Sequence, residues 1–223
     1  MKTEQILKAG SLDKQELNEE ELEKINQYTM RQMTAEEVYT FKLEVCNDQV
    51  DRDFERFSLE ALHGLAKMLK GKTIIRDHNP TSGNQVARIY DTSVEQMEKS
   101  HRLTAKCYLP RLEINRDFIA EIDAGIKKEV SIGCSMGKIT CSVCGKDNLK
   151  ESCGHIPGES YGGEPCHKVL EEPQDAYEVS FVAIPAQPEA GVTKSYLVHC
   201  CVPPKPEETN LQKLKDMFQE EKR

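Results

Sequence analysis

Three short segments of the chain carry the residue types of a serine hydrolase, in the order histidine, serine, acid. They are residues 76–80 (RDHNP), 129–133 (EVSIG) and 177–186 (YEVSFVAIPA), which contain His78, Ser131 and Glu178. A serine hydroxyl becomes a good nucleophile when a base takes its proton, and histidine, with an ordinary pKa of about 6.5, suits that role. A carboxylate on the other ring nitrogen fixes the tautomer. The segments predict Ser131 as nucleophile, His78 as general base and Glu178 as orienting acid.

Several other residues compete for these roles. Ser135 and Ser180 stand at even spacing from Ser131 and Glu178, so each is expected to share a strand face with that neighbour. Asp77 is an alternative acid, although on a strand it would point away from the face of the adjacent His78. Two further histidines, His63 and His101, lie in a helical and a strand-entry segment, where surface positions are expected.

The oxyanion hole has no single candidate. Backbone N–H groups that follow a nucleophile commonly stabilise the oxyanion, which points to residues 132–134. Arg88 is a weaker alternative.

A second chemical feature is a group of cysteines and histidines between the serine and acid segments. Cys141 and Cys144 form a Cys-x-x-Cys pair with Gly145 directly after it, and Cys153, His155 and Cys166 follow. Thiolate and imidazole ligands at such spacing suit a four-coordinate structural zinc site. We expect Cys141, Cys144 and Cys153 as ligands, with His155 as the fourth and Cys166 as the competitor for that place; His167 is less favoured. Free thiols on a loop, or a redox dithiol, are the alternatives.

The ordered set of three segments resembles the phage prohead (head maturation) serine proteases, which share a fold with the herpesvirus assemblins. The resemblance spans roughly residues 38–197 and includes residues 184–190 (IPAQPEA), similar to the family's Pro-Ala-Asn-Pro ending. It implies His78 and Ser131 directly as base and nucleophile, and it places Glu178 where assemblins carry a second histidine. Asn79 and Gln187 depart from the residues most frequent in the family. Cys/His insertions occur in a subset of these proteases.

The resemblance also implies a function and a setting. It implies an endopeptidase that cleaves scaffold and major capsid proteins, and potentially itself, inside assembling proheads in the host cytoplasm. Portal or other prohead components are further candidate partners, and a homo-oligomer is an option because assemblins dimerise. An inactive, protease-like assembly component of the prohead is the alternative function.

The elements that must position these residues follow from hydrophobic periodicity. Residues 1–36 are expected to form a polar helical arm, residues 37–198 the protease-like core with an insertion at 140–168, and residues 199–223 a Pro-rich linker and C-terminal helix. Alternation at 38–45 and apolar runs at 73–75, 86–90, 103–109, 130–139 and 178–184 predict strands. Residues 59–69, capped by Ser58, and 115–124 predict helices. We expect an α+β fold with a bent antiparallel sheet or barrel and peripheral helices.

Composition limits the function classes. The net charge of −8, from 30 basic and 38 acidic residues, argues against a general nucleic-acid-binding surface. No apolar run reaches the roughly 20 residues of a membrane-spanning helix, and no signal-peptide pattern opens the sequence, so we expect neither a membrane partner nor secretion. The nine cysteines are then expected as thiols or metal ligands rather than disulfides.

Overall fold

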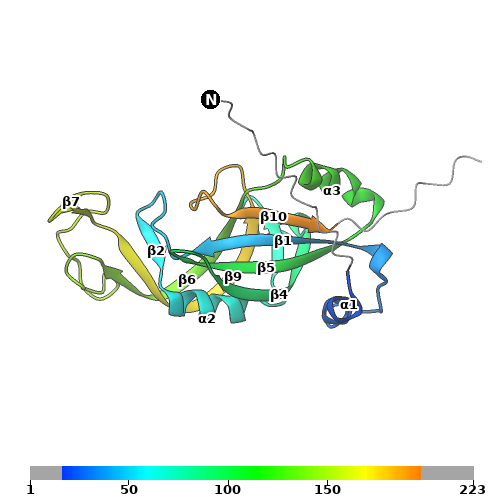
Figure 1. Cartoon of the computed structure of the whole chain (residues 1–223), viewed down its shortest axis with the longest axis horizontal. Coiled ribbons are helices and arrows are strands. Elements are labelled where there is room, and N and C mark those ends of the chain that lie inside the picture. The colour runs from blue at the N-terminus through cyan, green and yellow to red at the C-terminus, as the bar shows by residue number, and fades with distance from the viewer. Residues whose placement is uncertain (1–16, 197–223) are drawn as a thin grey trace, which may run out of the picture.

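The computed structural model describes residues 17–196 and shows a large sheet with three α-helices around it (Figure 1). The helices are α1 (Glu19–Asn26), α2 (Leu59–Leu69) and α3 (Arg116–Asp123), and single 3-10 turns form η1 (Ala35–Glu37), η2 (Ser82–Asn84) and η3 (Glu113–Asn115). The strands are β1 (Val38–Asn47), β2 (Glu55–Phe57), β3 (Thr73–Arg76), β4 (Ala87–Gln96), β5 (His101–Pro110), β6 (Val130–Cys141), β7 (Ser160–Tyr161), β8 (Glu164–Pro165), β9 (Lys168–Phe181) and β10 (Gly191–Tyr196).

The main sheet has eight strands in the order β10-β1-β5-β4-β3-β9-β2, with β6 paired to β9. β9 is the organising strand: β6 runs antiparallel along one of its edges, while β2 and β3 pair with it in parallel on the other. The short β7–β8 hairpin lies in the cysteine-containing insertion. Figure 1 shows this insertion at one end of the sheet and α1 at the opposite end.

The expected α+β class agrees with this mixed architecture, but two details of the expected sheet were wrong. The sheet is not purely antiparallel, because β2 and β3 both run parallel to β9. It is also not closed into a barrel. Between β6 and β10 there is no ladder in the described residues, only an isolated bridge between Glu129 and Gly191.

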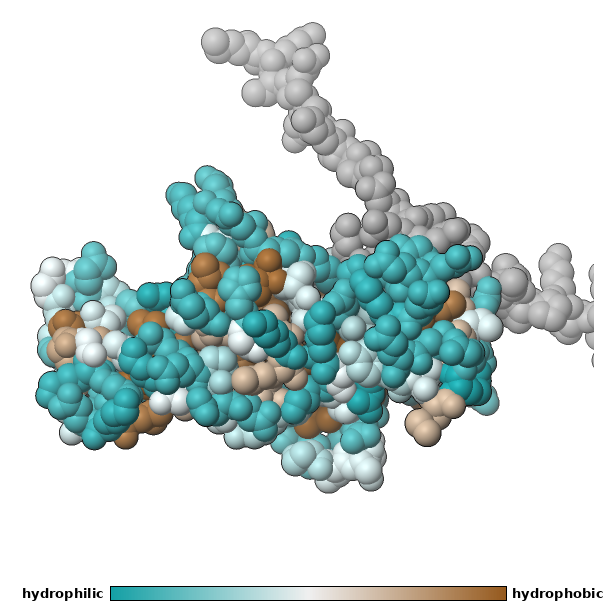
Figure 2. All heavy atoms as spheres, turned by 90° about the horizontal axis from the view of Figure 1, so that it is seen from below, coloured by the Kyte–Doolittle hydropathy of each residue, from teal (hydrophilic) through white to brown (hydrophobic). Residues whose placement is uncertain are grey.

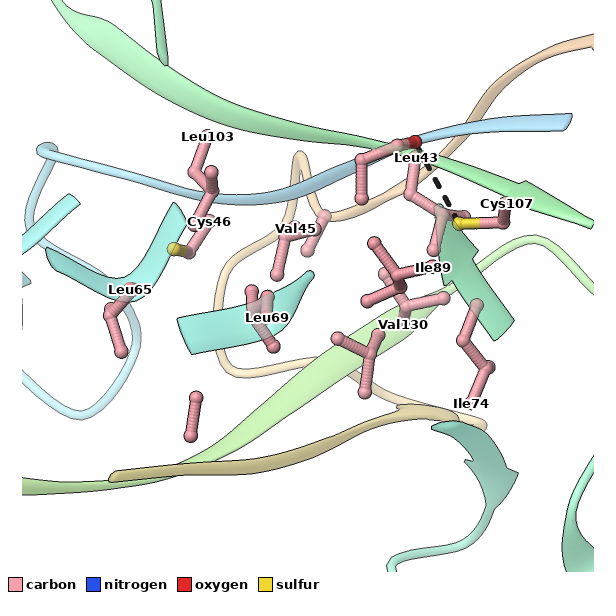
Figure 3. Close-up of a cluster of buried hydrophobic side chains, with 14 of the residues drawn as sticks. Leu43, Val45, Cys46, Leu65, Leu69, Ile74, Ile89, Leu103, Cys107 and Val130 are labelled. Atoms are coloured by element: carbon pink, nitrogen blue, oxygen red, sulfur yellow. Dashed lines mark hydrogen bonds between the residues drawn. The ribbon is translucent and has the colours of Figure 1, made fainter. Parts of the chain in front are cut away.

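The hydrophobic core lies on the inner face of the bent sheet, where side chains from β1, β3, β4, β5 and β6 meet α2 (Figure 3). The apolar residues of the expected alternation in β1, Tyr39, Phe41, Leu43 and Val45, are all buried in this core. The expected half-buried strand was wrong, because the intervening Thr40 and Glu44 are buried as well. The other face of β1 is also buried at its start. Val38 joins a second cluster with Ile25 of α1, Tyr90 and Tyr108, so α1 packs on the outer face of the sheet.

α2 shows how local sequence positions an element. Ser58 accepts a hydrogen bond from the backbone N–H of Ala61 at 3.1 Å, the expected N-cap. Leu62, Leu65 and Leu69 recur at helical spacing, and all three are fully buried against the sheet. The polar residues His63 and Lys67 lie on the exposed side of the same helix. Figure 2 shows the molecule from below the view of Figure 1, a face that is mostly hydrophilic with scattered apolar atoms.

The other expected elements match strands and helices with shifted ends. β9 begins at Lys168, ten residues before the expected start, because polar residues of this strand pair with β6 without entering the core. Across the described residues, no helix is both long and apolar enough to cross a membrane. Residues 1–16 and the Pro-rich linker and C-terminal helix expected at 199–223 lie outside the described residues, so the domain boundaries remain predictions.

Replacing Leu65 with alanine should lower the free energy of unfolding by about 2–5 kcal/mol, because a fully buried leucine leaves a cavity under the sheet. Urea denaturation followed by circular dichroism measures the change. Lys67→Ala on the exposed side of α2 is the matched control and should change stability by less than about 0.5 kcal/mol. Equal losses in the two variants would contradict the placement of α2.

Candidate active site and metal cluster

The centre of the candidate site is a hydrogen bond between His78 and Glu178. Nδ1 of His78 lies 2.7 Å from Oε1 of Glu178, across 100 residues of sequence. The carboxylate can only accept, so Nδ1 carries the proton and Nε2 is left with its lone pair. The Glu178 side chain is largely buried, whereas the His78 side chain is 44% exposed. The imidazole is therefore oriented from within the protein and open to a substrate on its other side.

Ser180 fixes both partners of this bond. Its hydroxyl donates to Oε2 of Glu178 at 2.6 Å and accepts from the backbone N–H of His78 at 3.0 Å. The residue is completely buried. Both hydroxyl functions are thus used inside the protein, so Ser180 acts as a positioning residue and does not compete as the nucleophile.

His78 does not lie on a strand, contrary to the expectation that its neighbour Asp77 would point to the opposite strand face. β3 ends at Arg76, and Asp77 and His78 both have left-handed backbone torsions, with φ of 54° and 50°. Each such non-glycine residue costs about 1–3 kcal/mol. The bond of His78 N–H to Ser180 and that of Asp77 N–H to the carbonyl of Phe181 hold this turn in place.

Gly133 leaves room for the carboxylate. In the β6–β9 ladder Gly133 lies directly opposite Glu178, and a Cβ at this position would come within 2.4 Å of Glu178 Oε1. Real Cβ atoms essentially never approach an atom so closely. The glycine of the Ser131-Ile132-Gly133 segment is therefore required by the position of the carboxylate.

Ser131 lies on the same sheet face as the histidine–carboxylate pair. It is directly opposite Ser180 in the antiparallel ladder, and side chains of such pairs have Cβ atoms roughly 4.5–5.5 Å apart. The alternate residues Val130 and Ile132 face the core instead. Within the described residues, no hydrogen bond joins Ser131 to His78. Catalytic hydrogen bonds are often long in proteins without substrate and shorten when substrate binds.

The competing residues lie elsewhere or are chemically unsuited. Ser135 does share the face of Ser131, but it stands roughly 13 Å further along β6, opposite Asp175. Burial, with the nearby charges of Glu55 and Glu178, raises the pKa of Cys134 to about 11, so its thiol stays protonated. His63 is exposed on α2, and His101 pairs with Asp48 at 2.8 Å.

The backbone N–H of Ile132 is the group whose direction would suit an oxyanion donor. Val130 donates to Ala190, and Val182 donates to Glu129, so along β6 the even residues point their N–H groups away from β9. The N–H of Gly133 points toward β9. Arg88 donates through Nη1 to the carbonyl of Gly71 at 2.6 Å, which leaves it a structural role next to the site.

The cysteine insertion contains a cluster that could hold a metal ion such as zinc. Ligand atoms of Cys141, Cys144, Cys153 and His155 all lie within 4.8 Å of one another. Sγ of Cys141 and Nδ1 of His155 are 3.7 Å apart. Two ligands bound to one tetrahedral zinc at about 2.3 and 2.1 Å would be roughly 3.6 Å apart. The geometry therefore fits a single ion.

Two of the three thiols in the cluster, those of Cys141 and Cys153, have lowered pKa values, whereas the pKa of Cys144 is raised by burial and by its thiol neighbours. Burial acts to raise the pKa of Cys141, yet backbone hydrogen bonds from Cys144 and Val143 lower it from 9.0 to about 7. A hydrogen bond from Asn148 is the main cause that lowers the pKa of Cys153. Gly145, with φ of 72°, closes the tight turn by donating to the carbonyl of Cys141. Metals bind thiolates, so these contacts favour the ligand form.

The two remaining candidates lie just outside this cluster. Cys166 is buried with its Sγ 4.0 Å from that of Cys141, but it does not belong to the group of four. His167 accepts a hydrogen bond from Nε of Arg56 at 3.2 Å. Cys46 and Cys107 are buried in the core as expected, and Cys200 and Cys201 lie outside the described residues.

The insertion docks on the segment before β2. Val143, Leu149 and Ile156 are exposed, so the insertion builds no core of its own. Gly158, with φ of 88°, lies so close to Phe54 that a Cβ would be 2.8 Å from its ring. The N–H of Lys168 donates to the carbonyl of Phe54 at 2.9 Å. These contacts connect the insertion to Phe54 and hence to the loop at residues 51–55.

Replacing Gly133 with alanine should displace the Glu178 carboxylate and reduce any activity that depends on His78 by about 10²-fold, the usual effect of a misplacement near 1 Å. Histidine ¹⁵N NMR should also show loss of the fixed Nδ1–H tautomer of His78. Gly83→Ala is the control, because nothing lies within 4 Å of its added Cβ. An unchanged His78 signal in Gly133→Ala would contradict the close approach.

The cluster predicts uptake of one tetrahedral metal ion per chain. Titration with Co²⁺ should give the visible bands of tetrahedral thiolate coordination, and Cys153→Ala should abolish them. Cys166→Ser should retain both stoichiometry and bands. If Cys166→Ser removed the bands and His155→Ala did not, Cys166 would be the fourth ligand.

Comparison with known proteins gives no match. No family model, no curated protein and no solved structure matches the chain. The chemistry of the site therefore rests on the contacts described above.

Proposed function

We propose that this chain is a serine endopeptidase with Ser131 as nucleophile, His78 as general base and Glu178 as orienting acid. One observation carries the proposal: the bond from His78 Nδ1 to Glu178 Oε1, with Ser131 on the same face of the neighbouring strand. A carboxylate held by Ser180 orients an imidazole whose second nitrogen is free. This is the arrangement that a serine needs for activation.

The reaction follows from these positions. Nε2 of His78 takes the proton of Ser131 as Oγ attacks the scissile carbonyl carbon, and Glu178 stabilises the imidazolium that forms. The same proton passes to the leaving amine nitrogen as the peptide C–N bond breaks, which leaves an acyl ester on Ser131. His78 then deprotonates a water molecule that attacks this ester, and the released proton returns to Ser131. The N–H of Ile132 is placed to stabilise the oxyanion.

Clefts on both sides of the site favour a polypeptide substrate. Ser131 borders a cavity of about 330 Å³, and Glu178 borders a second cleft of about 390 Å³ together with Tyr177. An extended chain that crosses the site can place residues in both. A small ester substrate would occupy only one of the two clefts, so the presence of both favours a polypeptide.

The biological substrate class in this proposal comes from the resemblance of the three segments to the prohead proteases. It is the scaffold and capsid protein of an assembling phage head. A protease enclosed with its substrates works at high local concentration, so modest intrinsic activity is sufficient.

The proposed role of the metal is structural zinc. Four protein ligands leave no open position for a catalytic water. The insertion has no hydrophobic core, so a metal ion supplies the stability that apolar burial does not. Through Phe54 and Gly158 it would hold the loop that borders the cavity beside Ser131.

An inactive assembly component is the second candidate function. The absence of a hydrogen bond between Ser131 and His78 in the described residues is the observation that favours it. A substrate-induced approach of the two side chains distinguishes an enzyme from such a component, and cleavage assays detect it.

Ser131→Ala should abolish cleavage of a cognate scaffold or capsid protein, measured on gels, because it removes the hydroxyl that is the proposed nucleophile. Ser135→Ala, four residues along the same strand face, is the matched control and should retain activity. Glu178→Gln should lower kcat by roughly 10²–10⁴-fold through loss of the correct tautomer. Cleavage that survives in Ser131→Ala, or a well-folded wild type that never cleaves, would overturn the assignment.

A further inference from the structure

The cavity beside Ser131 has an apolar interior and an acidic rim. Its interior is lined by residues of β1, β2, β6 and β9, among them Val45, Phe57, Ile132 and Leu170. Asp51, Asp53 and Glu55 form one wall, and no lysine or arginine belongs to its lining within the described chain. Cavities of this size accept a single large side chain rather than a folded partner.

The cavity opens along a free edge of the sheet. β6 pairs with β9 on one side, whereas no strand of the described residues pairs with its other side between Ile132 and Lys138. An extended peptide can pair with such an edge, and its alternate side chains then point to the two faces. One set passes Ser131 and His78, and the other enters the cavity.

The charges of the rim are only partly neutralised. Glu55 pairs with Lys168 at 3.3 Å, but no ion pair in the described part of the chain involves Asp51 or Asp53. Oδ1 of Asp51 accepts from the N–H groups of Asp53 and Glu55, both at 2.9 Å, which fixes the wall in one conformation. The rim therefore keeps a net negative charge at the mouth of an apolar slot.

The wall is also anchored from its other side. Arg52 donates through Nη1 to the carbonyl of Pro185 at 2.8 Å. Gln187, which borders the cavity, accepts from the N–H of Asn47 at 2.7 Å and donates to its carbonyl at 3.1 Å. The cavity is thus built by rigid contacts and does not depend on a mobile loop.

The cleft on the opposite side of the site lacks this excess of acid. Lys72 and Arg88 line it, Lys72 pairs with Asp175 at 3.3 Å, and Glu178, the one acid of the lining, is already bonded to His78. Within the described chain, a cationic side chain of a bound peptide finds carboxylates without an ion-pair partner at Asp51 and Asp53, and none in the lining of this cleft. This difference favours the cavity beside Ser131 for such a side chain.

We propose that the cavity beside Ser131 is a specificity pocket for a lysine or arginine side chain of the substrate, an inference that rests on the proposed endopeptidase function. The aliphatic part of such a side chain lies against Val45, Ile132 and Leu170, and its cationic end reaches Asp51, Asp53 and Glu55. The pocket selects substrates by both length and charge. Smaller or acidic side chains leave the rim carboxylates without a partner.

The test uses the full chain and a library of unstructured peptides, made by digesting a bacterial proteome with a protease that cuts beside acidic residues. Mass spectrometry of the new termini should show lysine and arginine enriched at one fixed position near the cleavage site. A peptide pair that differs only by lysine or norleucine at that position should differ about tenfold or more in kcat/KM.

Asp53→Lys should remove this preference or reverse it toward glutamate, while Asp53→Asn should weaken it. Asp117→Lys, on the exposed surface of α3 and away from the cavity, should keep the wild-type ratio. The readout is the ratio of kcat/KM for the lysine peptide to kcat/KM for the norleucine peptide, measured on one enzyme preparation. Because both values scale with the same amount of folded enzyme, a partial loss of folding does not change this ratio.

Two failures can be told apart. Cleavage by wild type that Ser131→Ala abolishes, with no enrichment of basic residues, would overturn the pocket assignment and leave the endopeptidase intact. Absence of cleavage from every peptide and from cognate protein would overturn the proposed function and this inference with it. Enrichment that Asp53→Lys does not change would place the basic side chain in a different cleft.

Discussion

The arrangement of the candidate site depends on where the Glu178 carboxylate lies. β9 is bordered by β3 on one side and β6 on the other, so a residue on its outer face can reach groups carried by both neighbours. Ser180, two residues along, holds one oxygen of the carboxylate, and His78 binds the other. Gly133 supplies the space. The strained turn at Asp77 and His78 is maintained because this same group of contacts holds the histidine backbone.

The sequence allowed much of this to be predicted, for physical reasons that can be named. α2 and β1 have strong periodicity, so their apolar faces are buried as expected, although the polar face of β1 is covered too. His78 and Glu178 were paired by residue type, and the structure brings them to 2.7 Å. The roles of Ser180 and Gly133 were missed, since they depend on the β6–β9 register. Even spacing from Glu178 and the glycine two residues after Ser131 were the available signals. The parallel pairing of β2 and β3 with β9 depends on long connections that local patterns do not specify.

The insertion is continuous with the two strands that carry Ser131 and Glu178. β6 ends at Cys141 and β9 begins at Lys168, so the cluster of thiols lies in the long connection between these strands. Along both strands the ladder holds their register, and a one-residue slip would move Gly133 away from Glu178. A metal ion bound at the cluster would fix the connection and so favour the register on which the carboxylate depends. The cluster and the candidate site would in this way be linked through the backbone.

Because the sheet does not close into a barrel, the edge of β6 that faces away from β9 stays unpaired in the described residues. A closed barrel would pair the outer side of β6 with another strand and would leave no edge groups for a peptide. It would also remove the cavity between β6 and residues 51–57, because a paired strand would occupy that space. An unpaired edge is a risk for aggregation, and acidic residues along it counteract that risk. The carboxylates at the rim can thus serve two purposes: they keep neighbouring chains away, and under the proposed function they would attract a basic segment of the substrate.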